Sequence, residues 1–206
     1  MTTRREFLQA GIAASALPVA IGGLASDSAA DPQPISSAQT APVSFYTAVF
    51  DERFPESIAF AAEMARLGVP THGIKGDMTA LWYHELQPLW SKTPVAIAGL
   101  TAHGPLFCLE RLAWDHGMRV RFRAEHQFRA DDCVEHSISA SGDVLDGASA
   151  LVSAGNAWST HVARLLGRCS QRPEPVARTV MTRLQEPVIT NREPLFSWVI
   201  APVVRG

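Results

Sequence analysis

Short β-rich runs alternate with helical runs through residues 43–117, and this alternation constrains the fold more than any other feature of the sequence. Runs rich in β-branched, aromatic and other apolar residues occupy residues 43–50, 69–75 and 94–100. Runs with apolar residues at helical spacing follow them at residues 55–67, 78–91 and 105–117. Strands that alternate with helices in this way are typical of a parallel sheet with helices on its faces. The sequence therefore predicts an α/β fold.

The remainder of the chain predicts an antiparallel addition to that sheet. Residues 118–126 alternate Val120 and Phe122 with arginines, and residues 133–141 follow as a hairpin partner at the exposed edge. A helix is predicted over residues 147–166, and a last strand over residues 196–204, which Pro202 places at an edge. Residues 43–206 are thus expected to form a single α/β domain. Its sheet should be mostly parallel, Rossmann-like or flavodoxin-like, with a possible antiparallel edge hairpin.

The N-terminal residues 1–30 have the three regions of an export signal in the expected order. An apolar run rich in alanine and glycine covers residues 11–25, and the small side chains of Ser28 and Ala30 suit cleavage after Ala30. Residues 31–42 are rich in Pro, Ser, Ala and Thr and are expected to form a flexible linker. The residues before the apolar run match a known consensus: Thr3, Arg4, Arg5, Phe7 and Leu8.

This segment resembles the signal peptides of the twin-arginine export route. The resemblance implies a periplasmic protein that the twin-arginine translocase carries in the folded state. Folded transport implies a cofactor inserted in the cytoplasm, a partner bound there, or folding too fast for the unfolded route. The alternative interpretation, an amphipathic first helix of the domain, fits the glycine-rich run poorly. Whether the signal is cleaved or retained as an anchor stays open.

Composition excludes some partner classes. The formal net charge is −2, and no run of lysine or arginine follows the signal, so we expect no nucleic-acid partner. No apolar run reaches the roughly 18–20 residues that a spanning helix needs, so we expect no stable transmembrane anchor after cleavage.

Polar residues that follow the three predicted parallel strands form the candidate site. Ligands of open α/β sheets bind beyond the carboxyl ends of the strands, so these loops are expected to converge on one cleft. The alternative is that the same side chains cap the next helix or face solvent. No GxGxxG or GxxxxGK[ST] motif is present, so no cofactor is identified. The candidate catalytic residues are Asp51, Asp77 and His103, and the candidate cofactor-binding residues are Gly99, Thr101 and Gly104.

Histidine and cysteine spacing gives no metal signature, and no metal site is predicted. His126 and His136 can become cross-strand neighbours in the predicted hairpin, which would make them the most plausible pair for a metal held by residues distant in the sequence. Cys108, Cys133 and Cys169 allow one disulfide with one free thiol, or three unpaired thiols. Cys108 lies between apolar residues of a predicted helix and is expected in the core rather than as a nucleophile.

The best functional hypothesis from the sequence is a non-catalytic accessory or small subunit of a periplasmic oxidoreductase, exported with a partner that carries the cofactor. The segment that supports it, residues 1–30, is similar to the signals of small subunits that accompany flavin dehydrogenases. One alternative is a small periplasmic enzyme or ligand-binding domain that uses the predicted cleft. Another is a cofactor-free protein that uses this route for its folding speed alone. Whether the protein catalyses a reaction stays open.

Overall fold

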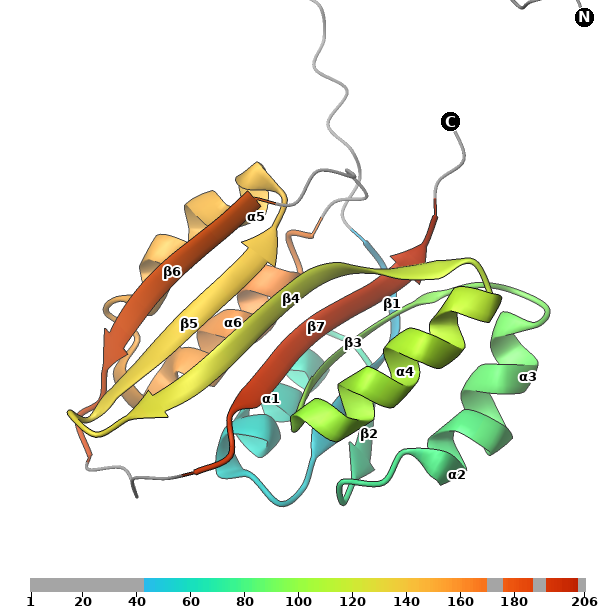
Figure 1. Ribbon diagram of the computed structural model, residues 1–206, viewed down its shortest axis with the longest axis horizontal. Helices are drawn as coiled ribbons and strands as arrows, with labels where there is room; N and C mark the ends of the chain where they lie inside the picture. The colour runs from blue at the N-terminus through green and yellow to red at the C-terminus, as the bar shows by residue number, and fades with distance from the viewer. Residues whose placement is uncertain (1–42, 170–175, 187–191, 204–206) are drawn as a thin grey trace, which may run out of the picture. The chain divides into compact units, whose positions relative to one another are not determined.

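The computed structural model describes residues 43–169, 176–186 and 192–203. The predicted signal and linker, with Arg4, Arg5, Phe7, Leu8 and the cleavage site at Ala30, lie outside the described residues. The described chain forms one seven-stranded mixed sheet with helices on both faces, which confirms the α/β prediction (Figure 1).

The sheet has the strand order β2-β1-β3-β7-β4-β5-β6. The strands are β1 (Phe45–Asp51), β2 (Thr71–Ile74), β3 (Ala96–Thr101), β4 (Met118–Arg129), β5 (Cys133–Ala140), β6 (Val176–Arg183) and β7 (Leu195–Pro202). The main helices are α1 (Pro55–Arg66), α2 (Thr79–Leu81), α3 (Gln87–Trp90), α4 (His103–Asp115), α5 (Gly142–Gly147) and α6 (Trp158–Leu166). A π-helical turn, η1 (Trp82–Leu86), joins α2 to α3, and two 3₁₀ turns, η2 (Ala148–Leu151) and η3 (Gly155–Ala157), join α5 to α6.

Antiparallel pairing dominates the sheet, so the prediction of a mostly parallel, Rossmann-like or flavodoxin-like sheet is wrong. Among the described strands, the parallel pairings are those of β1 with β2 on one side and with β3 on the other. The remaining four pairings, from β3–β7 to β5–β6, are antiparallel. The physical reason is that the alternation of strands and helices stops after α4, because β4 and β5 follow one another across a tight turn without a crossover helix.

The last described strand, β7, lies in the middle of the sheet, and its predicted edge position is wrong. It pairs with β3 on one side and β4 on the other. Pro202 is the final residue of the strand, so its missing N–H interrupts no ladder within β7. All other residues of β7 are buried, as expected for a strand covered on both faces.

The predicted hairpin of β4 and β5 is confirmed, but β6 rather than this hairpin forms the edge. The sequence did not indicate β6, because only Val180 and Thr182 of its eight residues are buried. The helix predicted over residues 147–166 is also interrupted, since η2 and η3 precede α6.

Two cores lie on opposite faces of the sheet. We call the face covered by α1, α5 and α6 the α6 face, and the face covered by α2, α3 and α4 the α4 face. Val120 pairs with Ile200 and Phe122 with Val199, so Arg121 is an extra residue in β4. Because of this bulge, Val120 packs against the α4-face core and Phe122 belongs to the α6-face core. One strand thereby contributes to both cores.

Candidate functional site

Parallel pairing brings the ends of β1, β2 and β3 to one edge of the sheet, as the candidate cleft requires. Asp51 is in register with Ile74 of β2, and Phe50 is in register with Leu100 of β3. Thr101, which follows Leu100, therefore lies at the same edge as Asp51.

Asp51 is fully buried and binds the arginine two residues later. Its Oδ1 accepts hydrogen bonds from the backbone N–H of Arg53 at 3.2 Å and from Arg53 Nε at 2.9 Å. Its Oδ2 accepts a third from Arg53 Nη2 at 2.7 Å. The Arg53 guanidinium also lies against the backbone of Gly76, where a Cβ would come within 2.6 Å of Cζ. Asp51 thus holds the β1–α1 loop against the loop after β2.

Asp77 and His103 point to other contacts. The backbone N–H of Thr79 donates to Asp77 Oδ1 at 2.8 Å, and bonds from the side chain and backbone of Thr79 lower the pKa of this exposed carboxyl. His103 is the exposed first residue of α4, and its ring lies 5.1 Å from that of Phe196. Within the described residues, no hydrogen bond or ion pair joins Asp77 or His103 to Asp51.

The three candidate cofactor-binding residues are also placed by the structure. Thr101 Oγ1 accepts a hydrogen bond from Trp198 Nε1 at 3.2 Å and donates one to the Ala102 carbonyl at 2.9 Å. Gly99 faces the Trp198 ring so closely that a Cβ would overlap it. Gly104 is exposed in the first turn of α4, with open space where a Cβ would stand.

The predicted neighbours His126 and His136 belong to a buried chain of hydrogen bonds that crosses four strands. The prediction that they pair across the hairpin is confirmed, and their Nδ1 atoms lie 2.7 Å apart. His126 Nε2 lies 2.8 Å from Ser197 Oγ on β7, and His136 Nε2 lies 2.9 Å from Thr182 Oγ1 on β6. Thr182 Oγ1 in turn lies 2.5 Å from the carbonyl oxygen of Leu151 in η2. We call these five residues the histidine chain.

The last acceptor sets the direction of every bond in the histidine chain. Thr182 has one hydroxyl proton, which it donates to the Leu151 carbonyl, so it accepts from His136 Nε2–H. A neutral His136 then carries no proton on Nδ1 and accepts from His126 Nδ1–H. His126 Nε2 is left to accept from the hydroxyl of Ser197. The donors therefore all run one way, from β7 to η2.

Burial keeps both imidazoles neutral. His126, His136, Thr182 and Ser197 are each 0% exposed. Burial, with a smaller contribution from His136, lowers the pKa of His126 well below its ordinary value, and burial lowers the pKa of His136 to about 4. The Trp158 ring lies over the pair, with its centroid 4.6 Å from that of His126 and 5.2 Å from that of His136.

The order serine, histidine, histidine is that of a base-activated nucleophile. The complete burial of Ser197 and His126 leaves no surface at which a reagent could meet the hydroxyl. The pattern of buried, evenly spaced positions in β4 and β5 indicated the two histidines. Ser197 and Thr182 had no such signal, because their strands are distant in the sequence.

A row of aromatic and basic side chains is exposed along α4, in contrast to the buried histidine chain. Phe107 is 48% exposed and Trp114 is 45% exposed. The Arg111 guanidinium lies 5.4 Å from the Phe107 ring and 4.5 Å from the Trp114 ring. The guanidinium of Arg119, at the start of β4, lies 5.8 Å from the Trp114 ring on its own account. We call His103, Phe107, Arg111, Trp114 and Arg119 the α4 stripe.

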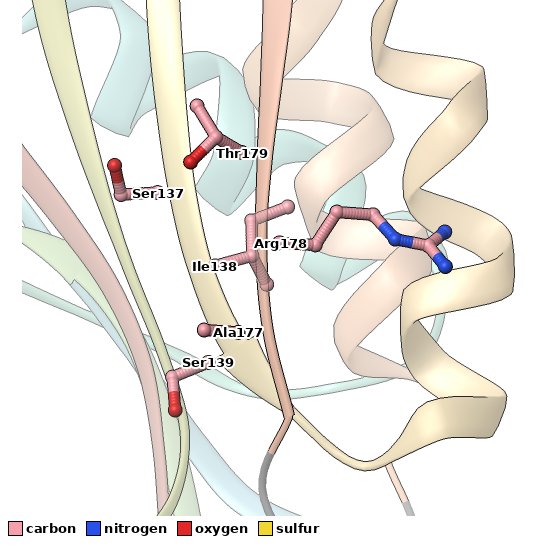
Figure 2. Close-up of a pocket in the computed structure, with 6 residues that line it drawn as sticks. All are labelled: Ser137, Ile138, Ser139, Ala177, Arg178 and Thr179. Atoms are coloured by element: carbon pink, nitrogen blue, oxygen red, sulfur yellow. The ribbon is translucent and has the colours of Figure 1, made fainter.

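On the α4 face, none of the described helices lies over β5 and β6, which α5 and α6 cover on the other face (Figure 1). A hollow of about 260 Å³ lies here. In Figure 2, the side chains of Ser137, Ser139 and Thr179 point away from α5, whereas that of Arg178 points toward it. Cys108, expected in the core, is exposed on α4, while Cys133 is buried, and both are free thiols.

No protein-family model matches this chain, and neither a curated protein nor a solved structure matches it. Among the described residues, no helix is long and apolar enough to cross a membrane. The same residues contain no group of three His, Cys, Asp or Glu side chains placed to hold a metal ion.

Proposed function

We propose that this protein is a non-catalytic accessory subunit of a periplasmic oxidoreductase, which it binds through the α4 stripe and accompanies along the twin-arginine route. The observation that carries the proposal is the exposure of Phe107, Arg111 and Trp114 on one side of a single helix. The predicted signal at Arg4 and Arg5 supports the route.

The composition of the α4 stripe supports binding to another protein. Tryptophan, phenylalanine and arginine are enriched in protein interfaces, and tryptophan and arginine are frequent among the residues that dominate binding energy. Phe107 and Trp114 leave about half of their surface in water, so folding alone does not account for their size. Arg111 lies between the two rings, which preorganises the three side chains for a partner.

The contacts at the predicted cleft also favour an accessory role over catalysis there. The carboxylate of Asp51 is bound by Arg53, and Asp77 caps the turn at Thr79. Thr101 is bound to Trp198. Each of these polar groups thus has a stabilising contact within the protein.

The proposal is tested by purifying the tagged full chain from the periplasm of the bacterium that naturally makes it. The wild-type protein should co-purify with a larger, cofactor-bearing enzyme in native mass spectrometry. Phe107→Ala/Trp114→Ala should weaken that complex by about 30-fold or more, since residues that dominate an interface contribute about 2 kcal/mol or more. Tyr83→Ala is the matched control, because Tyr83 is 61% exposed on η1 and lies outside the α4 stripe. A wild-type protein recovered only as a solitary monomer contradicts the proposal.

The export route is tested separately. Replacing Arg4 and Arg5 by lysine should leave the full chain and its partner in the cytoplasm, because both depend on one signal. Cell fractionation with antibodies against both proteins measures this result. Continued export of the double variant would reject the twin-arginine interpretation without affecting the binding test.

A further inference from the structure

The histidine chain joins the sheet to the helical layer above it at two places. Its final bond runs from Thr182 on β6 to the carbonyl of Leu151 in η2. Its two imidazoles lie under Trp158, the first residue of α6. Neither the predicted cleft nor the α4 stripe contains any member of this chain.

We propose that the histidine chain is an acid-sensitive latch, which holds η2 and the start of α6 on the sheet and opens when its two imidazoles take up a proton. The inference is independent of the proposed function, because it concerns the opposite face of the sheet from the α4 stripe.

The hydrogen bonds of the histidine chain leave no ring nitrogen that can take up a proton without losing an existing bond. A proton on His136 Nδ1 would set two N–H groups against each other across the 2.7 Å that separates it from His126 Nδ1. A proton on His126 Nε2 would turn the Ser197 hydroxyl away from its acceptor, since that nitrogen now accepts the serine proton. Either position also leaves a positive charge in the α6-face core.

Among the side chains that the structure describes, no carboxylate is hydrogen-bonded or ion-paired to either histidine. Glu125 and Glu135, on the strands of the two histidines, alternate with the buried positions and so belong to the opposite face of the sheet. His161 of α6 is partly exposed and bonds to the carbonyl of Ala157. On the helices and strands around this core, Glu63 is paired with Arg66 and Arg164, Glu56 with Arg192, and Asp146 with Arg178.

The sign of the effect follows from the burial of the pair. Burial lowers the pKa of His136 to about 4 and lowers the pKa of His126 well below the ordinary histidine value, so the opened form binds protons more readily than the closed form. The stability that the closed histidine chain contributes is therefore present above pH ~6.5 and is lost as the pH falls toward ~4. For each proton taken up, the equilibrium constant for opening should rise about tenfold for every unit by which the pH decreases in this range.

Hydrogen exchange of the full chain between pH ~7 and ~4, corrected for intrinsic exchange rates, measures the opening. Protection of residues 148–166 should fall as the pH decreases, before that of β1 and β3. The variant His126→Leu/His136→Leu/Ser197→Ala removes the titrating groups with side chains of similar size, and its protection should not change with pH in this range. His84→Gln, at an exposed position on η1, is the matched control and should behave as the wild type does.

A second measurement decides the case even if the triple variant fails to fold. Nitrogen NMR of the wild-type histidines should find the proton of His126 on Nδ1 and that of His136 on Nε2 at neutral pH. These signals should be lost over the same pH range as the protection of residues 148–166. A wild-type protein whose protection is unchanged down to pH ~4, or a folded triple variant that remains equally acid-sensitive, overturns the proposal.

Discussion

Gly99 is required by the ring beside it rather than by its own backbone angles. The residue lies in β3 opposite Trp198, and the tryptophan ring occupies the space that any side chain at Gly99 would need. Trp198 is itself fully buried and bonded to Thr101, so the ring has little freedom to move. The glycine that the sequence offered as a ligand contact thus has a packing role in the structure.

Gly99→Ala should destabilise the protein by about 1–3 kcal/mol, as overpacking of a close-packed core does. Urea denaturation at neutral pH measures the change. Gly104→Ala is the matched control five residues later, because open space surrounds that position in the first turn of α4. It should leave stability unchanged or raise it by up to about 1 kcal/mol. Equal urea midpoints for Gly99→Ala and the wild type would contradict the packing role.

Single residues were predictable where they shared the period of their strand. The pairing of His126 with His136 follows from the regular alternation of β5 and of the part of β4 after its bulge, which a short turn joins. The prediction that Cys108 lies in the core is wrong, because Cys108 and its apolar neighbour Phe107 are both on the exposed side of α4. The buried side of this helix contains Leu106 and Leu109. A local apolar context did not identify the buried side of this helix.

At the scale of elements, α1 and α6 are joined by one buried carboxylate. Glu63 accepts hydrogen bonds from Arg66 Nε at 2.8 Å and Nη2 at 2.6 Å within α1, and from Arg164 Nε of α6 at 2.7 Å. The bonds from Arg66, and then those from Arg164, lower the pKa of Glu63 to about 2. This contact ties together two helices that both pack on the α6 face.

Glu63→Gln should lower stability at neutral pH by about 1–3 kcal/mol, because it removes hydrogen bonds to a charged group. Since the pKa is lowered in the folded state, the contribution is present above pH ~4.5 and is lost as the pH falls toward ~2. Denaturation curves at several pH values should therefore show the variant and the wild type converging in acid. Glu135→Gln, in a partly exposed pair with Arg129, is the control and should change stability by less than about 0.5 kcal/mol.

Elements with a buried stripe were predictable, and the others were not. The predictions of β1, α1, β3 and α4 are confirmed to within a few residues. The edge strand β6 was missed because most of its side chains face water, which leaves no apolar period to detect. The position of β7 was mistaken because the effect of a proline depends on where it falls in the strand, and here it falls last.

For the whole molecule, the sequence predicted the α/β class but not the topology. Local periodicity identifies strands and helices, whereas the choice of neighbouring strand depends on contacts between residues far apart in the chain. Trp198 illustrates this dependence, since its buried position requires Gly99, about a hundred residues earlier, to lie beside it. The candidate cleft was likewise predictable as a shared edge, because parallel strands end together. The hydrogen bonds of Arg53 to the Asp51 carboxylate were not predictable from the sequence.

The central position of β7 has a consequence for the order of events during synthesis. Before residues 195–202 leave the ribosome, β2, β1 and β3 can form one half-sheet and β4, β5 and β6 another, each with an unpaired edge. Only the last described strand can join the two halves, and its contacts span much of the chain, which favours slow completion. A transporter that accepts only finished folds would therefore have to wait for the whole chain, so translocation would follow translation instead of accompanying it.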